Sequence, residues 1–175
     1  MDLSRYYGIE KEGQVPIILA DVVAEEKAAN IDGNDYLPLS FVQEQLNSRF
    51  YYDMNEKLLL YTTALDLYEI PLDSTTYTVS GEAAEHTCPI FVLQDEVPYV
   101  SLSFMENFSN FICNVYEAPH RLQIYTENVT HQTAVIQKAT AVRYQGGIKS
   151  DILEQQDAGS QVTVLEEMEN WSKVE

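Results

Sequence analysis

The chain has 175 residues and a formal net charge of −18 at pH 7. This charge argues against a nucleic-acid-binding protein, which needs clusters of Lys and Arg to contact phosphates, and it would also repel anionic lipid headgroups. No stretch approaches the ~18 apolar residues that a membrane-spanning helix needs. A hydrophobic content of 45% is typical of a folded protein, so we interpret the acid excess as a solubility feature of its surface.

The N-terminal part of the sequence predicts strands. Residues 1–14 are polar and form a lead-in, and the first five are not a signal peptide, because no apolar stretch follows them. The run Val15–Ala20 contains a proline, which predicts a first or edge strand. Residues 31–36 predict a hairpin, because Asp32-Gly33 favours the positive φ angles of a tight primed turn.

The chain contains an internal repeat. The segment Asp35-Tyr36-Leu37-Pro38-Leu39-Ser40-Phe41-Val42 returns 63 residues later as Pro98-Tyr99-Val100-Ser101-Leu102-Ser103-Phe104-Met105, and residues 52–62 match residues 116–126. A self-match of this kind indicates two copies of one small folding unit. The repeated positions are core and turn residues, which favours a spacer or a binding scaffold over an enzyme.

Each copy predicts one short helix. Ser40 with Gln43, and Ser103 with Glu106, fit a capping box, in which two side chains satisfy backbone N–H groups at the start of a helix. The apolar residues expected to face the core from these helices are Phe41, Val42, Leu46, Phe104, Met105 and Phe108.

A hairpin follows each helix. The alternation of Leu58 with Leu60, and of Leu122 with Ile124, predicts the buried face of each hairpin. The predicted fold class is therefore α+β: two repeated small α+β units, with antiparallel strands and one short helix each, followed by a partial all-β small barrel.

The last region of the chain predicts this barrel. Residues 141–144, 161–165 and 171–174 are typical of short strands, separated by polar turns that contain glycine. The domain boundaries that we expect are 1–14 for the lead-in, 15–65 for the first unit, 66–130 for the second unit and 133–175 for the partial barrel.

The two repeats resemble a known small domain. Tyr36-Leu37-Pro38-Leu39-Ser40-Phe41-Val42, followed by Tyr52-Asp53 and the strand Lys57-Leu58-Leu59-Leu60-Tyr61, is similar to the domain first described at the N-terminus of copper amine oxidases. That domain is common in exported proteins of Gram-positive bacteria. The resemblance covers residues 15–127 as two copies, with Ser at 40 and 103 where the family often has Arg. Amine oxidase chemistry belongs to a separate catalytic domain, so the resemblance implies an accessory module.

Residues 140–174 resemble a bacterial Src-homology-3-like domain whose closing strand is missing. Paired amine-oxidase-type domains with such a tail are similar to the N-terminal half of certain exported family 18 glycoside hydrolases of clostridia. The catalytic signature D-x-x-D-x-D-x-E of that family does not occur in the sequence. The combination implies a non-catalytic region that targets or spaces a hydrolase acting on chitin-like or peptidoglycan glycans. It also implies an extracellular or cell-envelope location, with the leader or anchor outside this sequence.

The sequence shows no catalytic motif. His86, His120 and His131 lack the close spacing of paired metal ligands. Cys88 and Cys113 have no recognisable His partner, and two free buried thiols are favoured over a disulfide between them. We therefore expect a chain that is not an enzyme, with no catalytic, metal-binding or cofactor-binding residues and no cofactor.

Aromatic side chains are the candidate ligand-binding residues. The chain has 12 Tyr and one Trp, which a β-rich fold largely explains, but exposed rings can also stack on sugars. The candidates are Tyr51, Tyr52, Tyr116 and Trp171, and the expected partner is peptidoglycan or another cell-wall glycan. A structural stalk that dimerises is a further alternative, and the sequence leaves the oligomeric state open.

Overall fold

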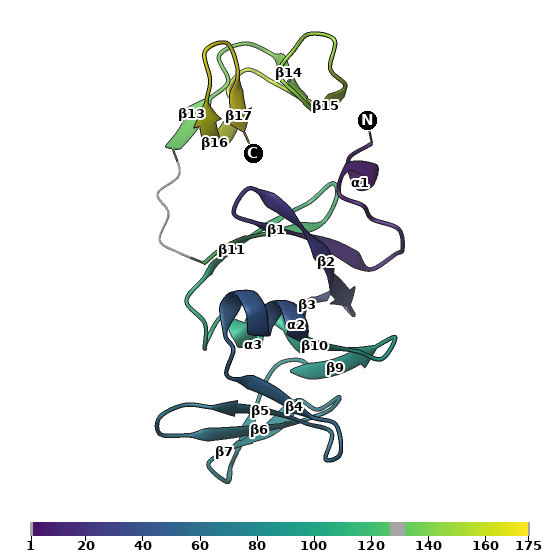
Figure 1. Cartoon of the computed structure of the whole chain (residues 1–175), viewed down its shortest axis with the longest axis vertical. Coiled ribbons are helices and arrows are strands. Elements are labelled where there is room, and N and C mark those ends of the chain that lie inside the picture. Colours follow the sequence, from purple (N-terminus) through teal and green to yellow (C-terminus); the bar gives the residue numbers. More distant parts are fainter. Residues whose placement is uncertain (1, 127–131, 175) are drawn as a thin grey trace. The chain divides into compact units, whose positions relative to one another are not determined.

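The computed structural model describes residues 2–126 and 132–174, which form two compact units (Figure 1). The larger unit is Glu10–Glu127, and the smaller unit combines Met1–Ile9 with Asn128–Glu175. Part of the predicted lead-in, residues 1–9, therefore belongs to the same unit as the C-terminal region.

Seven strands of the larger unit form one sheet in the order β11-β12-β1-β2-β3-β10-β9. Their bounds are β1 Gln14–Leu19, β2 Val22–Ile31, β3 Asn34–Pro38, β9 Phe91–Gln94, β10 Val97–Ser101, β11 Ile112–Tyr116 and β12 Arg121–Tyr125. Strand β1 pairs in parallel with β12, so the first and last strands of this unit lie side by side. The hairpin β2–β3 confirms the predicted Asp32-Gly33 turn, with φ angles of 50° and 80°.

Strand β1 is the first strand, as predicted, but it is not an edge. It lies between β12 and β2 in the interior of the sheet. Its pairing register with β2 shifts between Pro16 and Ile18, and a bulge of this kind is where a sheet tolerates a residue that cannot donate a hydrogen bond.

A second sheet of the larger unit has five antiparallel strands in the order β4-β5-β6-β7-β8. Their bounds are β4 Phe50–Asp53, β5 Leu58–Thr62, β6 Leu67–Pro71, β7 Thr76–Val79 and β8 Glu82–Glu85. The predicted buried face of β5 is wrong: Leu59 and Tyr61 face the core, whereas Leu58 and Leu60 are only partly buried. In β12, burial of Leu122 and Ile124 is confirmed.

The smaller unit is built from short strands. A three-stranded sheet has the order β13-β16-β17, and β14 pairs with β15. The bounds are β13 Gln132–Val135, β14 Thr140–Arg143, β15 Ile152–Gln156, β16 Gln161–Glu167 and β17 Ser172–Val174. Strands β14, β16 and β17 correspond to the three predicted strands, and β13 and β15 were not predicted. The Tyr6 ring of the N-terminal segment lies 5.8 Å from the Tyr144 ring.

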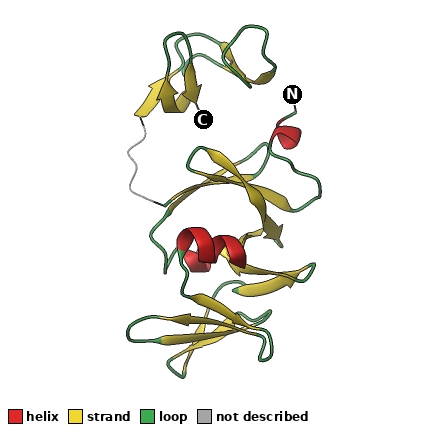
Figure 2. Cartoon of the chain, in the orientation of Figure 1, coloured by secondary structure: helices red, strands yellow, loops and turns green. Residues whose placement is uncertain are grey.

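The predicted α+β class is wrong, because the chain is predominantly β. The helical segments are α1 Leu3–Tyr6, α2 Leu39–Phe41, the π-helical η1 Val42–Leu46, and α3 Leu102–Met105, shown in red in Figure 2. Segments of this length have too few helical hydrogen bonds to form a layer, and the Tyr-, Val- and Thr-rich sequence around them favours strands. Among residues 2–126 and 132–174, no helix is long and apolar enough to cross a membrane.

The predicted capping boxes are also wrong. Helix α2 begins after Pro38 and α3 after Ser101, which places Ser40 and Ser103 inside the first helical turn. The Ser40 hydroxyl instead hydrogen-bonds the Glu26 carboxylate, and the Ser103 hydroxyl lies within hydrogen-bonding distance of other side chains. These serines therefore tie the helical turns to neighbouring segments.

The two repeats meet through their equivalent strands, β3 and β10. In this antiparallel pair Leu37 lies opposite Val100, Tyr36 opposite Ser101, and Pro38 opposite Tyr99. The internal repeat makes Leu37 equivalent to Val100 and Tyr36 equivalent to Tyr99, so the Leu37–Val100 pair lies on a local pseudo-two-fold axis. Helix α2 contacts β10 and α3 contacts β3, so each helical turn also packs on the strand of the other repeat.

Both repeats contribute to a single hydrophobic core. Phe41 and Val42 from the first copy are buried in it together with Phe104 and Met105 from the second, as predicted. Leu46 and Phe108 pack against the same core and are partly buried. The repeated motif therefore supplies the interior of one shared structure.

We expect truncation of Leu37 to destabilise the whole larger unit. Leu37 is 0% exposed, and Leu→Ala changes at buried sites cost about 2–5 kcal/mol. Leu37→Ala should therefore lower the urea midpoint of the larger unit in one cooperative transition, measured by far-ultraviolet circular dichroism. Leu65→Ala is the matched control: Leu65 is 90% exposed, and its loss should cost no more than about 0.5 kcal/mol. Equal midpoints for the two variants would contradict the shared core.

Candidate functional site

Two of the predicted ligand-binding residues are neighbours on β4 and point to opposite faces. Tyr51 is 60% exposed and lies in a row across the outer face of the five-stranded sheet, opposite Leu60. Tyr52 packs against the core, with its ring 4.9 Å from the Phe91 ring in an edge-on arrangement. Of this pair, only Tyr51 presents a ring that a sugar could stack on.

The other two candidates lie elsewhere. Tyr116 is on β11 of the seven-stranded sheet, and the Arg121 guanidinium lies over its ring at 4.9 Å from the centroid. Trp171 belongs to the smaller unit, is 38% exposed, and packs so closely on Gly146 that a Cβ there would lie 3.1 Å from the indole. The structure therefore does not gather Tyr51, Tyr52 and Tyr116 into one binding platform.

His120 links the two repeats through carboxylates. Its Nε2 lies 2.8 Å from Asp35 Oδ1, and its Nδ1 lies 3.0 Å from Glu117 Oε1. Burial alone would lower the pKa of His120, but the hydrogen bonds and charges of the two carboxylates outweigh it and raise the pKa. Asp35 also accepts a hydrogen bond from the Asn30 amide at 2.8 Å. His120 is thus a turn residue held in an ion pair, and His131 lies outside the described residues.

His86 takes part in a second polar cluster. Its Nε2 lies 2.9 Å from the Ser103 hydroxyl, which lies 2.9 Å from the Ser101 hydroxyl, and Cys88 Sγ lies 3.5 Å from Ser101. Burial lowers the pKa of His86, so its ring is neutral at pH 7.

A serine beside a neutral histidine is the first element of nucleophilic catalysis. The internal repeat supplies a comparison: the equivalent serine of the first copy, Ser40, bonds to Glu26, and no histidine in the described part of the chain bonds to it. The feature common to both copies is a serine that links a helical turn to a segment earlier in the chain. We therefore interpret the Ser103–His86 contact as structural.

Both cysteines are free, with Cys88 buried and Cys113 partly buried. Burial, with smaller contributions from Glu106 and Asp35, raises the pKa of the Cys113 thiol to about 12. Its reactive thiolate form is therefore scarce at neutral pH.

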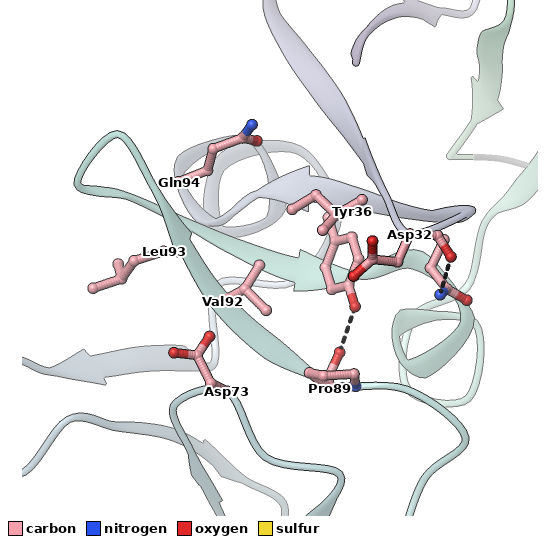
Figure 3. Close-up of a pocket in the computed structure, with 9 residues that line it drawn as sticks. Asp32, Tyr36, Asp73, Pro89, Val92, Leu93 and Gln94 are labelled. Atoms are coloured by element: carbon pink, nitrogen blue, oxygen red, sulfur yellow. Dashed lines mark hydrogen bonds between the residues drawn. The ribbon is translucent and has the colours of Figure 1, made fainter.

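The larger unit has a pocket of about 300 Å³ (Figure 3). It is formed by the hairpin β2–β3, by the turn after β6, and by strand β9 together with Pro89, which lies two residues before that strand. Its lining residues are Ile31, Asp32, Asn34, Tyr36, Asp73, Pro89, Val92, Leu93 and Gln94.

Tyr36 fixes one wall of this pocket. It is 1% exposed, and its hydroxyl donates a hydrogen bond to the Pro89 carbonyl at 2.9 Å, drawn as a dashed line in Figure 3. Burial above all raises the pKa of the Tyr36 phenol, followed by contact with Cys88 and the charges of Asp32 and Asp73. The phenol is therefore neutral, and two carboxylates lie close enough to affect it.

Sequence reasoning missed this pocket. Asp32 was recognised only as a turn residue, and Asp73 belongs to a segment without a motif. The Asp73 backbone N–H donates to the Phe91 carbonyl at 2.8 Å, which holds its turn against β9. The pairing of β3 with β10 and of β10 with β9 brings the hairpin of Asp32 to the same strand, β9.

In the described ranges, no three His, Cys, Asp or Glu side chains converge as a metal site would require. Comparison with known proteins gives no further indication: no family model matches the chain, and no curated protein or solved structure matches it.

The His120 ion pair should make stability depend on pH. The raised pKa means that its stabilising effect is complete below the unfolded-state value of about 6.5 and is lost as the pH rises through the folded-state pKa. We expect the difference in free energy of unfolding between wild type and His120→Gln to shrink as the pH rises from 6 to about 8.5. Urea denaturation at each pH measures it. A difference that grows with pH would contradict the assignment.

Proposed function

We propose that this chain is a non-catalytic accessory region of an exported bacterial glycoside hydrolase, and that it targets or spaces the hydrolase at the cell wall. The resemblance of the repeats and of residues 140–174 to accessory domains of such enzymes motivates the proposal. The parent activity, on chitin-like or peptidoglycan glycans, is part of the same proposal.

The observation that carries the proposal is the use of the repeated motif in the core. The equivalent pair Leu37 and Val100, and the equivalent pair Phe41 and Phe104, are all buried within the shared core. The residues that recur in the two copies are therefore core residues that the fold requires, as in a scaffold. The exposed residues of the two copies are free to differ.

The larger unit is inserted between the two segments of the smaller unit, residues 1–9 and 128–175, and the path of the chain places its two connections at opposite ends of one strand pair. Strands β1 and β12 are parallel, with Ile17 opposite Leu122, so the chain enters at one end of this strand pair and leaves at the other. Gln14 lies three residues before Ile17, and Tyr125 lies three residues after Leu122. At a rise of ~3.3 Å per residue, entry and exit are separated by about 20 Å along the strands.

A sedimentation experiment tests the wall-targeting role. We expect the purified chain to sediment with peptidoglycan sacculi, and to do so better once attached anionic polymers are removed, because the charge of −18 repels them. Binding should survive high salt if it runs through neutral sugars or peptide stems. Absence of binding would restrict the role to a spacer, and hydrolysis of chitin or peptidoglycan fragments by the chain would refute the proposal.

Glycan binding through Tyr51 is the second candidate function, favoured by the exposure of its ring on the outer face of the five-stranded sheet. If the ring stacks on sugars, Tyr51→Ala should reduce sedimentation with sacculi without changing the urea midpoint. Met54→Ala is the matched control, since Met54 is 72% exposed in the turn of the same hairpin. Equal sedimentation of both variants and wild type would remove this candidate.

A further inference from the structure

The pocket beside Tyr36 carries negative charge that the protein does not neutralise. Its nine lining residues include two aspartates and no Lys, Arg or His. Asp32 and Asp73 are both exposed, and among residues 2–126 and 132–174 neither carboxylate has a hydrogen bond or ion pair. Exposed aspartates are common on an acidic protein, so the charge alone does not define a site.

The internal repeat shows that this arrangement is specific to one copy. Asp95 is the equivalent of Asp32 in the second repeat, and both residues have a φ of 50° in their hairpin turns. The Asp95 carboxylate lies 3.9 Å from Lys11 Nζ, whereas no cation of the described residues forms an ion pair with Asp32. The same turn is thus paired with a cation in one copy and open to the pocket in the other.

The remaining walls of the pocket are largely apolar. Ile31, Pro89, Val92 and Leu93 provide hydrocarbon surface, and the amides of Asn34 and Gln94 provide donors and acceptors. A bare metal ion needs several converging oxygen ligands, and no group of three acidic, His or Cys side chains forms one among the described residues. Apolar walls with two exposed carboxylates among the lining residues fit an organic cation better.

We infer that this pocket binds a small organic ammonium ion: a primary amine on a body the size of a single sugar ring, with the amine toward Asp32 and Asp73. The volume of about 300 Å³ lies at the lower end of the range for small-molecule pockets, which suits a ligand of this size. The inference does not depend on the accessory role proposed above, because it rests on the pocket alone.

Glucosamine and N-acetylglucosamine are the probes that test this inference. They share one ring, but only glucosamine carries an ammonium group, and a pH of about 6.5 keeps that group protonated. Chemical-shift titration of the full chain should show saturable binding of glucosamine at pocket residues such as Val92, with binding of N-acetylglucosamine at least about tenfold weaker. Added salt should weaken glucosamine binding.

Three Asp→Asn variants complete the test. Asp32→Asn and Asp73→Asn should each weaken glucosamine binding by roughly tenfold, and both should fold, because Asn tolerates left-handed backbone as Asp does. Asp95→Asn is the matched control, with the same charge change in the equivalent turn, and should leave binding unchanged. The inference is overturned if the two sugars bind equally, if Asp95→Asn weakens binding as much as Asp32→Asn, if Ca²⁺ occupies the site in preference to glucosamine, or if no saturable binding occurs.

Discussion

The antiparallel pairing of β3 with β10 is the constraint on which the larger unit depends. The motif strand of the first repeat, β3, pairs with that of the second, β10, and Leu37 lies opposite Val100 at the centre of the pair. A single copy would leave the backbone N–H and C=O groups on one edge of this strand without their partners, and would expose the apolar face that the other helical turn covers. The parallel pairing of β1 with β12 is a second constraint, because it joins the first strand of the unit to its last.

The sequence predicts local features of this fold better than it predicts the arrangement of the sheets. Hairpins are predictable because a turn such as Asp32-Gly33 has its own backbone preference. The buried face of β5 is not, because three consecutive leucines, 58 to 60, fit either face, and Tyr61 decides the register only through its packing on Phe50. The full length of strand β2 was not predicted, because its acidic and Ala-rich centre has a low β propensity, which pairing with β1 and β3 overrides.

The contribution of helices to the fold was overestimated for a related reason. Ser40-Phe41-Val42 and Ser103-Phe104-Met105 do have the pattern of a helix start, and the backbone follows it for about one turn in the second copy and, as a π-helix, to Leu46 in the first. The chain must then reverse into β4 or β11 to keep its sheet partners, so tertiary pairing ends each helix early. The pocket was beyond sequence reasoning altogether, because Asp32 and Asp73 belong to turns of two different sheets that only tertiary contacts bring to the same pocket.

Comparison of the two copies also shows that the hairpin turns are positions where this protein can acquire function. In the second repeat, Glu96 occupies the position of Gly33 and adopts a φ of 65°, a left-handed conformation that costs a non-glycine residue about 1–2 kcal/mol. In the second repeat the turn geometry is therefore imposed by the strand pairing and not by local preference. Because the backbone is fixed in this way, the side chains at the turns can diverge without loss of the fold. Asp95 lies near Lys11, whereas Asp32 lines the pocket, so two equivalent carboxylates on the same turn have acquired different surroundings.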